Sequence, residues 1–503
     1  MRRVTLSSMA VVLLLPLAAC APEQEGAQVE MAAASANVVM AMPVSTSSDA
    51  ALDEFMQGQR LLDMGRADEA RSHFERAAEA DPNFCLAYLR LANVATSLES
   101  FQMNLERAAA NAEGASEAEQ LMVEFNQRGL DGDNAGQMQV AKRLVEVQPE
   151  SPRAWMMLAN AQAGMNDVEA SRATWLKVTE TSPSFASAQM ALGNSYMFVE
   201  PRDLAMAQQH MEKAVELEPN EALPHDLLGD AYRARGELEL AAEEYTRTAE
   251  LDPTSGNGFQ QRGHVHSFLG NYDQARADYD AAIDIVENGN VKVSFAVYRS
   301  LASVHEGNAA GAVEELNGLF ANVDAMEIPE PTGSKIFVLN TMIQIALHEG
   351  MFEEAEAAME QRDALVMEQA LQIGSESADR NARATAVMGE GLLAAYKGDY
   401  ETATAKANEY ISIVEPNTSP TKNRPAHALL GYVALSQDDY DEAIANYEQA
   451  NPNNPYVMYY HALALEGAGN TDGAKALFQK VASYNFNSPG LALIRKDAMA
   501  RAM

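Results

Sequence analysis

A 34-residue period runs through residues 222–289 and constrains the fold of this 503-residue chain more than any other feature. Two glycines, an alanine and a tyrosine recur at this interval, as Gly229, Gly236, Ala241 and Tyr245 and then as Gly263, Gly270, Ala275 and Tyr279. A fixed period of this length is the signature of stacked repeats, in which each unit buries its apolar face against its neighbours. The sequence therefore predicts a stacked array.

Each unit is expected to form two helices joined by a tight turn. Leu228, Gly229 and Tyr232 have the three- and four-residue spacing of one helix face. Because Gly229 has no side chain, a second helix can approach its backbone closely. Gly236 stands where the first helix must stop, a place that favours a left-handed residue. Pro253 is tolerated at the start of the next helix but not in a helix interior. Neither helix can bury its apolar face alone.

The period and the pattern of small and aromatic residues resemble those of tetratricopeptide repeat (TPR) proteins. The resemblance covers roughly residues 51–486 and is strongest at 51–84 and 152–289. In the first repeat the characteristic positions are Gly58, Gly65, Ala70, Phe74, Ala77 and Pro82. The resemblance implies an all-α fold, a right-handed superhelix of helix pairs whose first helices line a concave groove. It does not imply an enzyme.

The composition agrees with an all-helical protein and adds a strong charge. Ala, Met, Leu and Glu are abundant, and β-branched runs with a period of two are almost absent. The chain has 36 Lys and Arg against 72 Asp and Glu, a net charge of −36. Such a surface repels nucleic acid and anionic membranes and favours neutral or basic partners. The alternative interpretation is that the charge serves solubility alone.

The N-terminus has the features of an export signal. Arg2 and Arg3 precede an apolar stretch at 9–19 that is too short to span a bilayer. The sequence LAAC at 17–20 resembles the lipobox of bacterial lipoproteins, which implies cleavage after residue 19 and attachment of acyl chains to Cys20. Ala21 follows the cysteine, and by the sorting rule of enteric lipoproteins this favours the outer membrane, facing the periplasm. The alternative is an ordinary signal peptide with a coincidental cysteine.

The rest of the chain divides by composition. Residues 20–48 are expected to be a flexible tether, 49–323 an N-terminal TPR array, 324–335 a Pro-rich linker, 336–486 a C-terminal TPR array and 487–503 a capping helix. In that last helix Leu491, Ile494 and Ala498 are assigned to one side, and Arg495 and Lys496 to the other. The remaining cysteine, Cys85, is expected to be a small buried residue, with a reactive thiol as the alternative.

A row of polar residues marks the predicted groove. Asn or Asp follows the small residue of several first helices, and a histidine stands at the same place in another, giving Asn93, Asn160, Asn194, Asp230 and His264. In TPR proteins this position usually faces the groove, so the resemblance implies side chains that hydrogen-bond a peptide backbone. The alternative is an ordinary polar lining. Arg90, Arg153 and Arg233 are scattered along the sequence, which argues against capture of a C-terminal carboxylate.

Catalytic and cofactor motifs are missing from the sequence. His264 and His266 are two residues apart, which turns them to nearly opposite sides of a helix. There is no HExxH, Cys/His cluster, GxSxG, P-loop or dinucleotide fingerprint, and DGDN at 131–134 lacks the later ligands of a calcium loop. We therefore expect no metal, no cofactor and no enzyme activity.

The sequence thus predicts a lipid-anchored TPR adaptor that binds a protein or peptide in its groove, with a role in envelope assembly. Two other interpretations stay open. The superhelix could enclose a small molecule such as a glycan fragment, as an enzyme or a subunit, or the chain could be a purely structural spacer.

Overall fold

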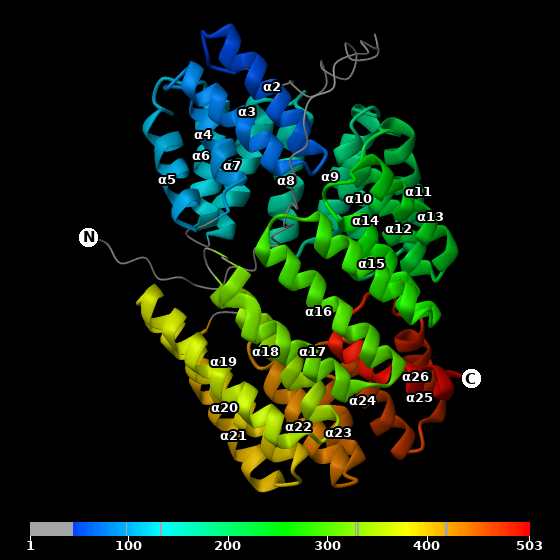
Figure 1. Ribbon diagram of the computed structural model, residues 1–503. Helices are drawn as coiled ribbons and strands as arrows, with labels where there is room; N and C mark the ends of the chain where they lie inside the picture. Colours follow the sequence, from blue (N-terminus) through cyan, green and yellow to red (C-terminus); the bar gives the residue numbers. More distant parts are fainter. Residues whose placement is uncertain (1–43, 97, 131–132, 327, 329–330, 418–420) are drawn as a thin grey trace. The chain divides into compact units, whose positions relative to one another are not determined.

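The computed structural model describes residues 44–96, 98–130, 133–326, 328, 331–417 and 421–503. Within these residues the chain is all helical, without strands (Figure 1). The described residues divide into two compact units, 44–232 with 239–258 and 233–238 with 259–503, which we call the first and the second unit. The predicted signal sequence, Cys20 and most of the predicted tether lie outside the described residues. In the part that the structure describes, no helix combines the length and apolarity needed to cross a bilayer.

Helices of the first unit alternate as first and second members of pairs. In chain order they are α2 Asp49–Asp63, α3 Ala67–Ala80, α4 Cys85–Asn93, α5 Leu98–Ala110, α6 Glu117–Leu130, α7 Asn134–Val147, α8 Pro152–Gly164, α9 Val168–Thr181, α10 Ala186–Phe198, α11 Leu204–Leu217, α12 Ala222–Arg235 and α13 Leu238–Leu251. We call the surface formed by the first helices of the pairs, here α2, α4, α6, α8, α10 and α12, the inner face.

The structure confirms the packing predicted within a repeat. Tyr245 is fully buried, and a Cβ atom on Gly229 would lie 2.5 Å from its Cε1, so only glycine admits the ring. Gly236 follows the end of α12 with a φ of 81°, the left-handed conformation expected there. Cys85 is 2 % exposed, and burial raises the pKa of its thiol to about 12, which agrees with a packing role.

The end of the predicted tether is attached to the first unit. The Ser45 amide donates to Glu119 Oε1 over 2.8 Å, and the Thr46 hydroxyl donates to Asp81 Oδ2 over 2.6 Å. Val44 packs against the hydrophobic core, and Ser48 caps α2. Residues 44–48 therefore belong to the folded array.

The second unit continues the alternation and ends with a lone helix. Its helices are α14 Asn257–Leu269, α15 Tyr272–Ile285, α16 Gly289–Glu306, α17 Ala309–Asn322, the 3₁₀ helix Val323–Met326, α18 Thr332–His348, α19 Phe352–Ile373, α20 Glu376–Tyr396, α21 Tyr400–Val414, α22 Arg424–Ser436, α23 Tyr440–Tyr447, α24 Pro455–Gly467, α25 Thr471–Ala482 and α26 Pro489–Ala502.

The described residues of the predicted linker, 324–326, 328 and 331–335, lie inside the second unit. Val323 is fully buried and Ile328 is 8 % exposed, and both belong to one hydrophobic cluster with Val293 of α16 and Val338 of α18. The division of the described chain falls instead around 233–259, within the most regular repeats.

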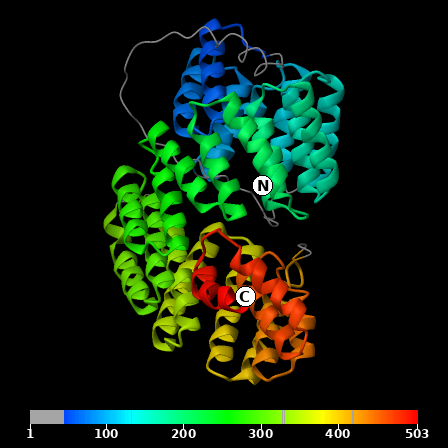
Figure 2. The ribbon, with the colours of Figure 1, turned by 90° about the vertical axis from the view of Figure 1, so that its right-hand side faces the viewer.

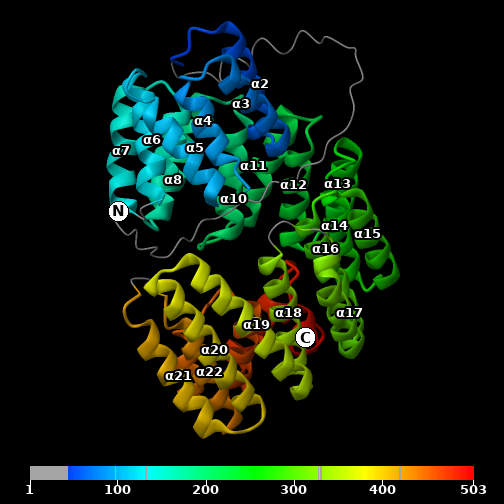
Figure 3. The same ribbon diagram turned by 60° about the vertical axis from the view of Figure 1, so that its left-hand side comes forward.

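The last helix, α26, packs against several helices of the second unit and not only against the last repeat. α26 packs against α25 and also against the first helices α16, α18 and α24, as Figures 2 and 3 show for the red C-terminal segment. The prediction that Arg495 lies opposite Leu491 was wrong: Arg495 is 7 % exposed. Its position is four residues after Leu491 and three before Ala498, which places it on their helix face. Thus α26 lies on the inner face of the second unit.

Candidate groove of the first unit

The five predicted groove residues lie on first helices, but their surroundings differ. Asn93, the last residue of α4, and Asn160 of α8 are exposed, and Asn194 of α10 is partly buried. Asp230 of α12 is 8 % exposed and His264 of α14 is 5 % exposed. The predicted position therefore meets solvent in some repeats and is enclosed in others.

In the two most regular repeats the residue at this position forms a hydrogen bond with a buried tyrosine. The Tyr245 hydroxyl donates to Asp230 Oδ1 over 2.7 Å, and the Tyr279 hydroxyl lies 2.6 Å from His264 Nδ1. Both tyrosines are fully buried, and a buried hydroxyl needs a partner. Asp230 and His264 thus have a structural role, as partners of buried hydroxyl groups, whether or not a ligand binds.

Asn160 and Asn194 do not face a tyrosine hydroxyl. The residues that take the place of the tyrosine are Trp175 and Met211, neither of which carries a hydroxyl. Among the described residues, Asn194 Oδ1 is buried and has no hydrogen-bond partner. These two amides retain hydrogen-bonding capacity that a ligand on the inner face could use.

The row is longer than the sequence analysis proposed. Gln59 follows Gly58 in the first repeat, and Asn126 stands in register in the irregular third repeat. With the Asn93 amide oriented to satisfy its surroundings, its nitrogen donates to Asn126 Oδ1 over 3.1 Å. The period alone would have found Gln59, because it stands 34 residues before Asn93. We call Gln59, Asn93, Asn126, Asn160, Asn194 and Asp230 the polar row.

A charged network joins the start of this row. Arg153, at the beginning of α8, makes a bidentate salt bridge to Asp63, at the end of α2, with distances of 3.2 and 2.5 Å. Gln59 Nε2 donates to Asp63 Oδ1 over 3.0 Å, and Arg90 Nε donates to Gln59 Oε1 over 2.6 Å. First helices three repeats apart therefore meet, which requires a concave inner face. Burial and the charge of Arg153 lower the pKa of Arg90 to about 10.

In the second unit the chain's own C-terminal segment occupies the inner face. The Asn487 amide lies 3.2 Å from His264 Nδ1, and Asn487 Oδ1 lies 3.0 Å from His305 Nε2. Asn485 donates to the Arg233 carbonyl over 2.9 Å and accepts from Arg495 over 2.7 Å. Burial, with the charges of Arg233 and His305, lowers the pKa of His264 well below its usual value.

Tyrosines complete the lining of the second unit. The Tyr456 hydroxyl of α24 lies 2.8 Å from the Tyr396 hydroxyl of α20 and 2.8 Å from His348 Nδ1 of α18. Tyr432 of α22 stacks on Tyr396 with 4.7 Å between the ring centroids. First helices of this unit are therefore joined through their side chains.

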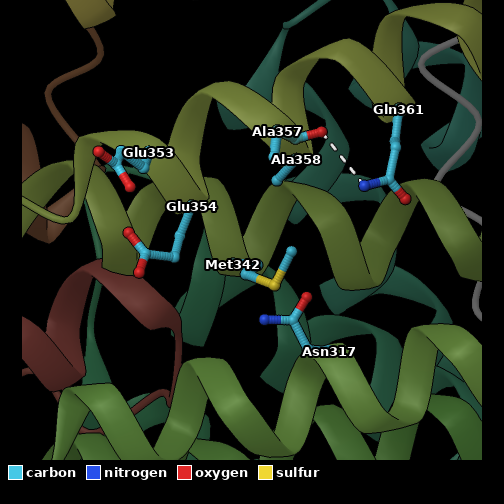
Figure 4. Close-up of a pocket in the computed structure, with 7 residues that line it drawn as sticks. All are labelled: Asn317, Met342, Glu353, Glu354, Ala357, Ala358 and Gln361. Carbon is cyan, nitrogen blue, oxygen red and sulfur yellow. Dashed lines mark hydrogen bonds between the residues drawn. The ribbon is translucent and has the colours of Figure 1, made fainter.

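A pocket of about 260 Å³ lies among α17, α18 and α19 of the second unit (Figure 4). It is lined by Asn317, Met342, Glu353, Glu354, Ala357, Ala358 and Gln361, and both glutamates are exposed. Two solvated carboxylates on a second helix are an ordinary surface feature. Across the described ranges, no three His, Cys, Asp or Glu side chains gather as metal ligands would.

Comparison with known proteins identifies the repeats. Models of the tetratricopeptide repeat match residues 55–118, 257–287 and 434–496. None of the curated proteins matches the sequence.

Three solved structures illustrate the similarity, and one of them, YrrB, is described as a TPR protein. MamA from Desulfovibrio magneticus RS-1 is 18% identical over 34% of this chain and 96% of its own, with a TM-score of 0.30. The Cut9–Hcn1 hetero-tetramer of APC/C is 15% identical over 92% of this chain and 79% of its own, with a TM-score of 0.41. YrrB is 20% identical over 37% of this chain and 92% of its own, with a TM-score of 0.29. From its stacked helix pairs and the three family matches, the chain is an all-α protein that contains tetratricopeptide repeats.

Proposed function

We propose that the chain is a non-catalytic adaptor that binds a protein or peptide partner on the inner face of its first unit. The observation that carries the proposal is the contrast within the polar row. Asn160 is exposed and Asn194 Oδ1 lacks a partner among the described residues. By contrast, the Asn93 amide bonds Asn126, and Asp230 accepts a hydrogen bond from Tyr245. Amides in a row can pair with an extended backbone and make little demand on its side chains.

The proposal includes anchoring through Cys20 to the outer membrane of a bacterium, facing the periplasm. The lipobox-like sequence at 17–20 supports it. Attachment is tested by labelling with a fatty acid: Cys20→Ala should abolish incorporation and release the protein from the membrane fraction. Cys85→Ala is the control and should change neither. Labelling that persists in Cys20→Ala would reject the anchor.

The binding role is tested by co-purification from the native organism with the full chain carrying Asn160→Ala and Asn194→Ala. We expect a partner recovered in stoichiometric amount with the wild type to be lost with this variant. Gln209→Ala removes an exposed amide from the second helix α11; it is the matched control and should retain the partner. A partner that binds all three proteins equally would contradict binding at the polar row. If small molecules shift the melting temperature of the purified chain and no protein co-purifies, the small-molecule interpretation replaces this one.

A further inference from the structure

We propose that Tyr396 and Tyr432, on the inner face of the second unit, are a site of oxidative cross-linking, where a one-electron oxidant joins the two phenol rings as dityrosine. The site is independent of the proposed function, because the partner is placed on the first unit. Tyr396 belongs to α20 and Tyr432 to α22, two first helices that contact each other. The cross-link would therefore join two successive repeats.

The rings of Tyr396 and Tyr432 lie face to face. Their centroids are 4.7 Å apart, and their planes are inclined by 27°. Tyr460 of α24 also contacts Tyr432, but at 5.4 Å and with 73° between the planes, and it contacts Tyr456 at 65°. Two phenoxyl radicals couple when the faces of their ortho carbons overlap, so a nearly parallel pair is oriented for the reaction and a nearly perpendicular pair is not.

A chain of hydrogen bonds gives the phenol proton of Tyr396 an acceptor. The Tyr396 hydroxyl lies 2.8 Å from the Tyr456 hydroxyl, which lies 2.8 Å from His348 Nδ1. With the imidazole protonated at Nε2, Tyr456 donates to His348 and accepts from Tyr396. Burial lowers the pKa of His348, so the imidazole is neutral at pH 7 and can take up a proton. Burial also raises the pKa of Tyr396, so the phenol keeps its proton until an electron is removed.

The reaction balances with two equivalents of a one-electron oxidant from solution, such as a peroxidase intermediate formed with hydrogen peroxide. Each equivalent removes one electron from one phenol. The proton of Tyr396 moves to Tyr456 as the proton of Tyr456 moves to His348, which later releases it to water, and the proton of Tyr432 passes to water. A bond forms between the two ortho carbons, and the hydrogen on each of them is transferred as a proton to the phenol oxygen. The product has lost two hydrogen atoms.

The composition and the topology give this cross-link a use. Two cysteines, at 20 and 85, allow at most one disulfide in a chain that has 17 tyrosines. Tyr396 and Tyr432 are both partly buried, so their rings are neither fully exposed nor sealed from an oxidant in solution. A bond between them closes a loop that contains α21, Tyr400–Val414. Because such a loop restricts the unfolded chain, the cross-link should stabilise the second unit, as a disulfide does.

The test uses the purified full chain, photo-oxidised tris(bipyridine)ruthenium with persulfate as the oxidant, and a protein concentration low enough to keep chains separate. We expect a monomeric product with dityrosine fluorescence that is lighter by two hydrogen atoms. Peptide mapping by mass spectrometry should join Tyr396 to Tyr432. Tyr396→Phe and Tyr432→Phe keep the rings but cannot form a phenoxyl radical, so each should lose this product. Tyr460→Phe changes the perpendicular neighbour and should retain it.

The peptide map of the wild type decides the proposal even where a variant unfolds. The site is rejected if Tyr396 and Tyr432 are not joined, or if other tyrosine pairs are joined in equal yield. His348→Gln should form the same pair at least about tenfold more slowly, since glutamine can accept a hydrogen bond but not the proton. An unchanged rate would reject the proton path. The cross-linked wild type should melt at a higher temperature than the untreated chain, and an equal melting temperature would contradict the stabilising use.

Discussion

The two units are built from the same kind of helix pair, yet their inner faces differ in what covers them. In the first unit that face presents exposed amides and a charged network of Gln59, Asp63, Arg90 and Arg153. In the second unit the segment 484–488, α26 and linked tyrosines lie on it. The repeat therefore specifies how helices pack, and residues outside the repeat decide whether a groove is available to a partner.

The largest expected effect comes from weakening the segment that fills the second unit. Leu491 is fully buried and Ile494 is 1 % exposed, both in α26. Leu491→Ala with Ile494→Ala should destabilise the second unit by roughly 2–5 kcal/mol for each substitution, through lost burial and new cavities. Hydrogen exchange followed by mass spectrometry should show faster exchange in α16, α18 and α24, with α2–α9 unchanged. Equal changes in both units would contradict the division described here.

Breaking the charged network of the first unit should come next. Asp63→Asn leaves Arg153 without its carboxylate at a position of low exposure. Removal of one member of a buried ion pair costs about 3–5 kcal/mol. The measurement is chemical unfolding of the variant against wild type, with Asp68→Asn, whose partner Arg71 is less buried, as the control. A loss no greater than that of Asp68→Asn would show that the network contributes little.

Substitutions of Asp230 and Asn160 should change the free energy of unfolding by different amounts, although the two residues occupy the same repeat position. Asp230→Ala leaves the buried Tyr245 hydroxyl without this acceptor and should cost about 1–3 kcal/mol. Asn160→Ala removes an exposed side chain and should stay within about 0.5 kcal/mol. Unfolding free energies of the two variants check this. Equal costs would mean that Asn160 also has a structural partner.

Acid should destabilise the second unit through His305. Burial lowers the pKa of His305 to about 4, although the hydrogen bond with Asn487 opposes this shift. Because the folded pKa lies below the unfolded value near 6.5, the stability it contributes is present above pH 6.5 and is lost as the pH falls toward 4, by up to about 1.4 kcal/mol per pH unit.

His225 of the first unit should behave in the opposite way. Its hydrogen bond with Glu244 raises the pKa, so its contribution is present below pH 6.5 and is lost as the pH rises through the folded value. Unfolding of wild type, His305→Gln and His225→Gln at pH 7 and pH 5 tests both signs. If the free energy of unfolding of His305→Gln falls as much between pH 7 and pH 5 as that of wild type, His305 is not the group that titrates.

Residue spacing was sufficient to predict the helix pair and four of the six residues of the polar row. Gly229, Tyr245 and Gly236 have the packing and backbone geometry that their positions required, because these contacts lie within one 34-residue unit. The binding role of Asn93, Asn160, Asn194, Asp230 and His264 stays a prediction, although His264 is now known to lie against Asn487.

Contacts between distant repeats could not be predicted in this way. The meeting of Asp63 with Arg153 depends on small rotations summed over three repeats, and spacing along the chain does not encode that sum. The place of α26 depends on a segment that follows the last repeat and has no counterpart within the period. Arg495 is different: its spacing from Leu491 and Ala498 already placed it on the buried face, and its charge misled the assignment.

The contrast between the inner faces is tested most directly by cysteine labelling in a chain that carries Cys20→Ala and Cys85→Ala. Asn160→Cys and His264→Cys place a thiol at the same repeat position in the first and the second unit. The account predicts that a maleimide reacts with position 160 as fast as with an exposed control such as Gln209→Cys. It should react with position 264 at least about a hundredfold more slowly, at a rate set by opening of the C-terminal segment. Equal rates at positions 160 and 264 would contradict it.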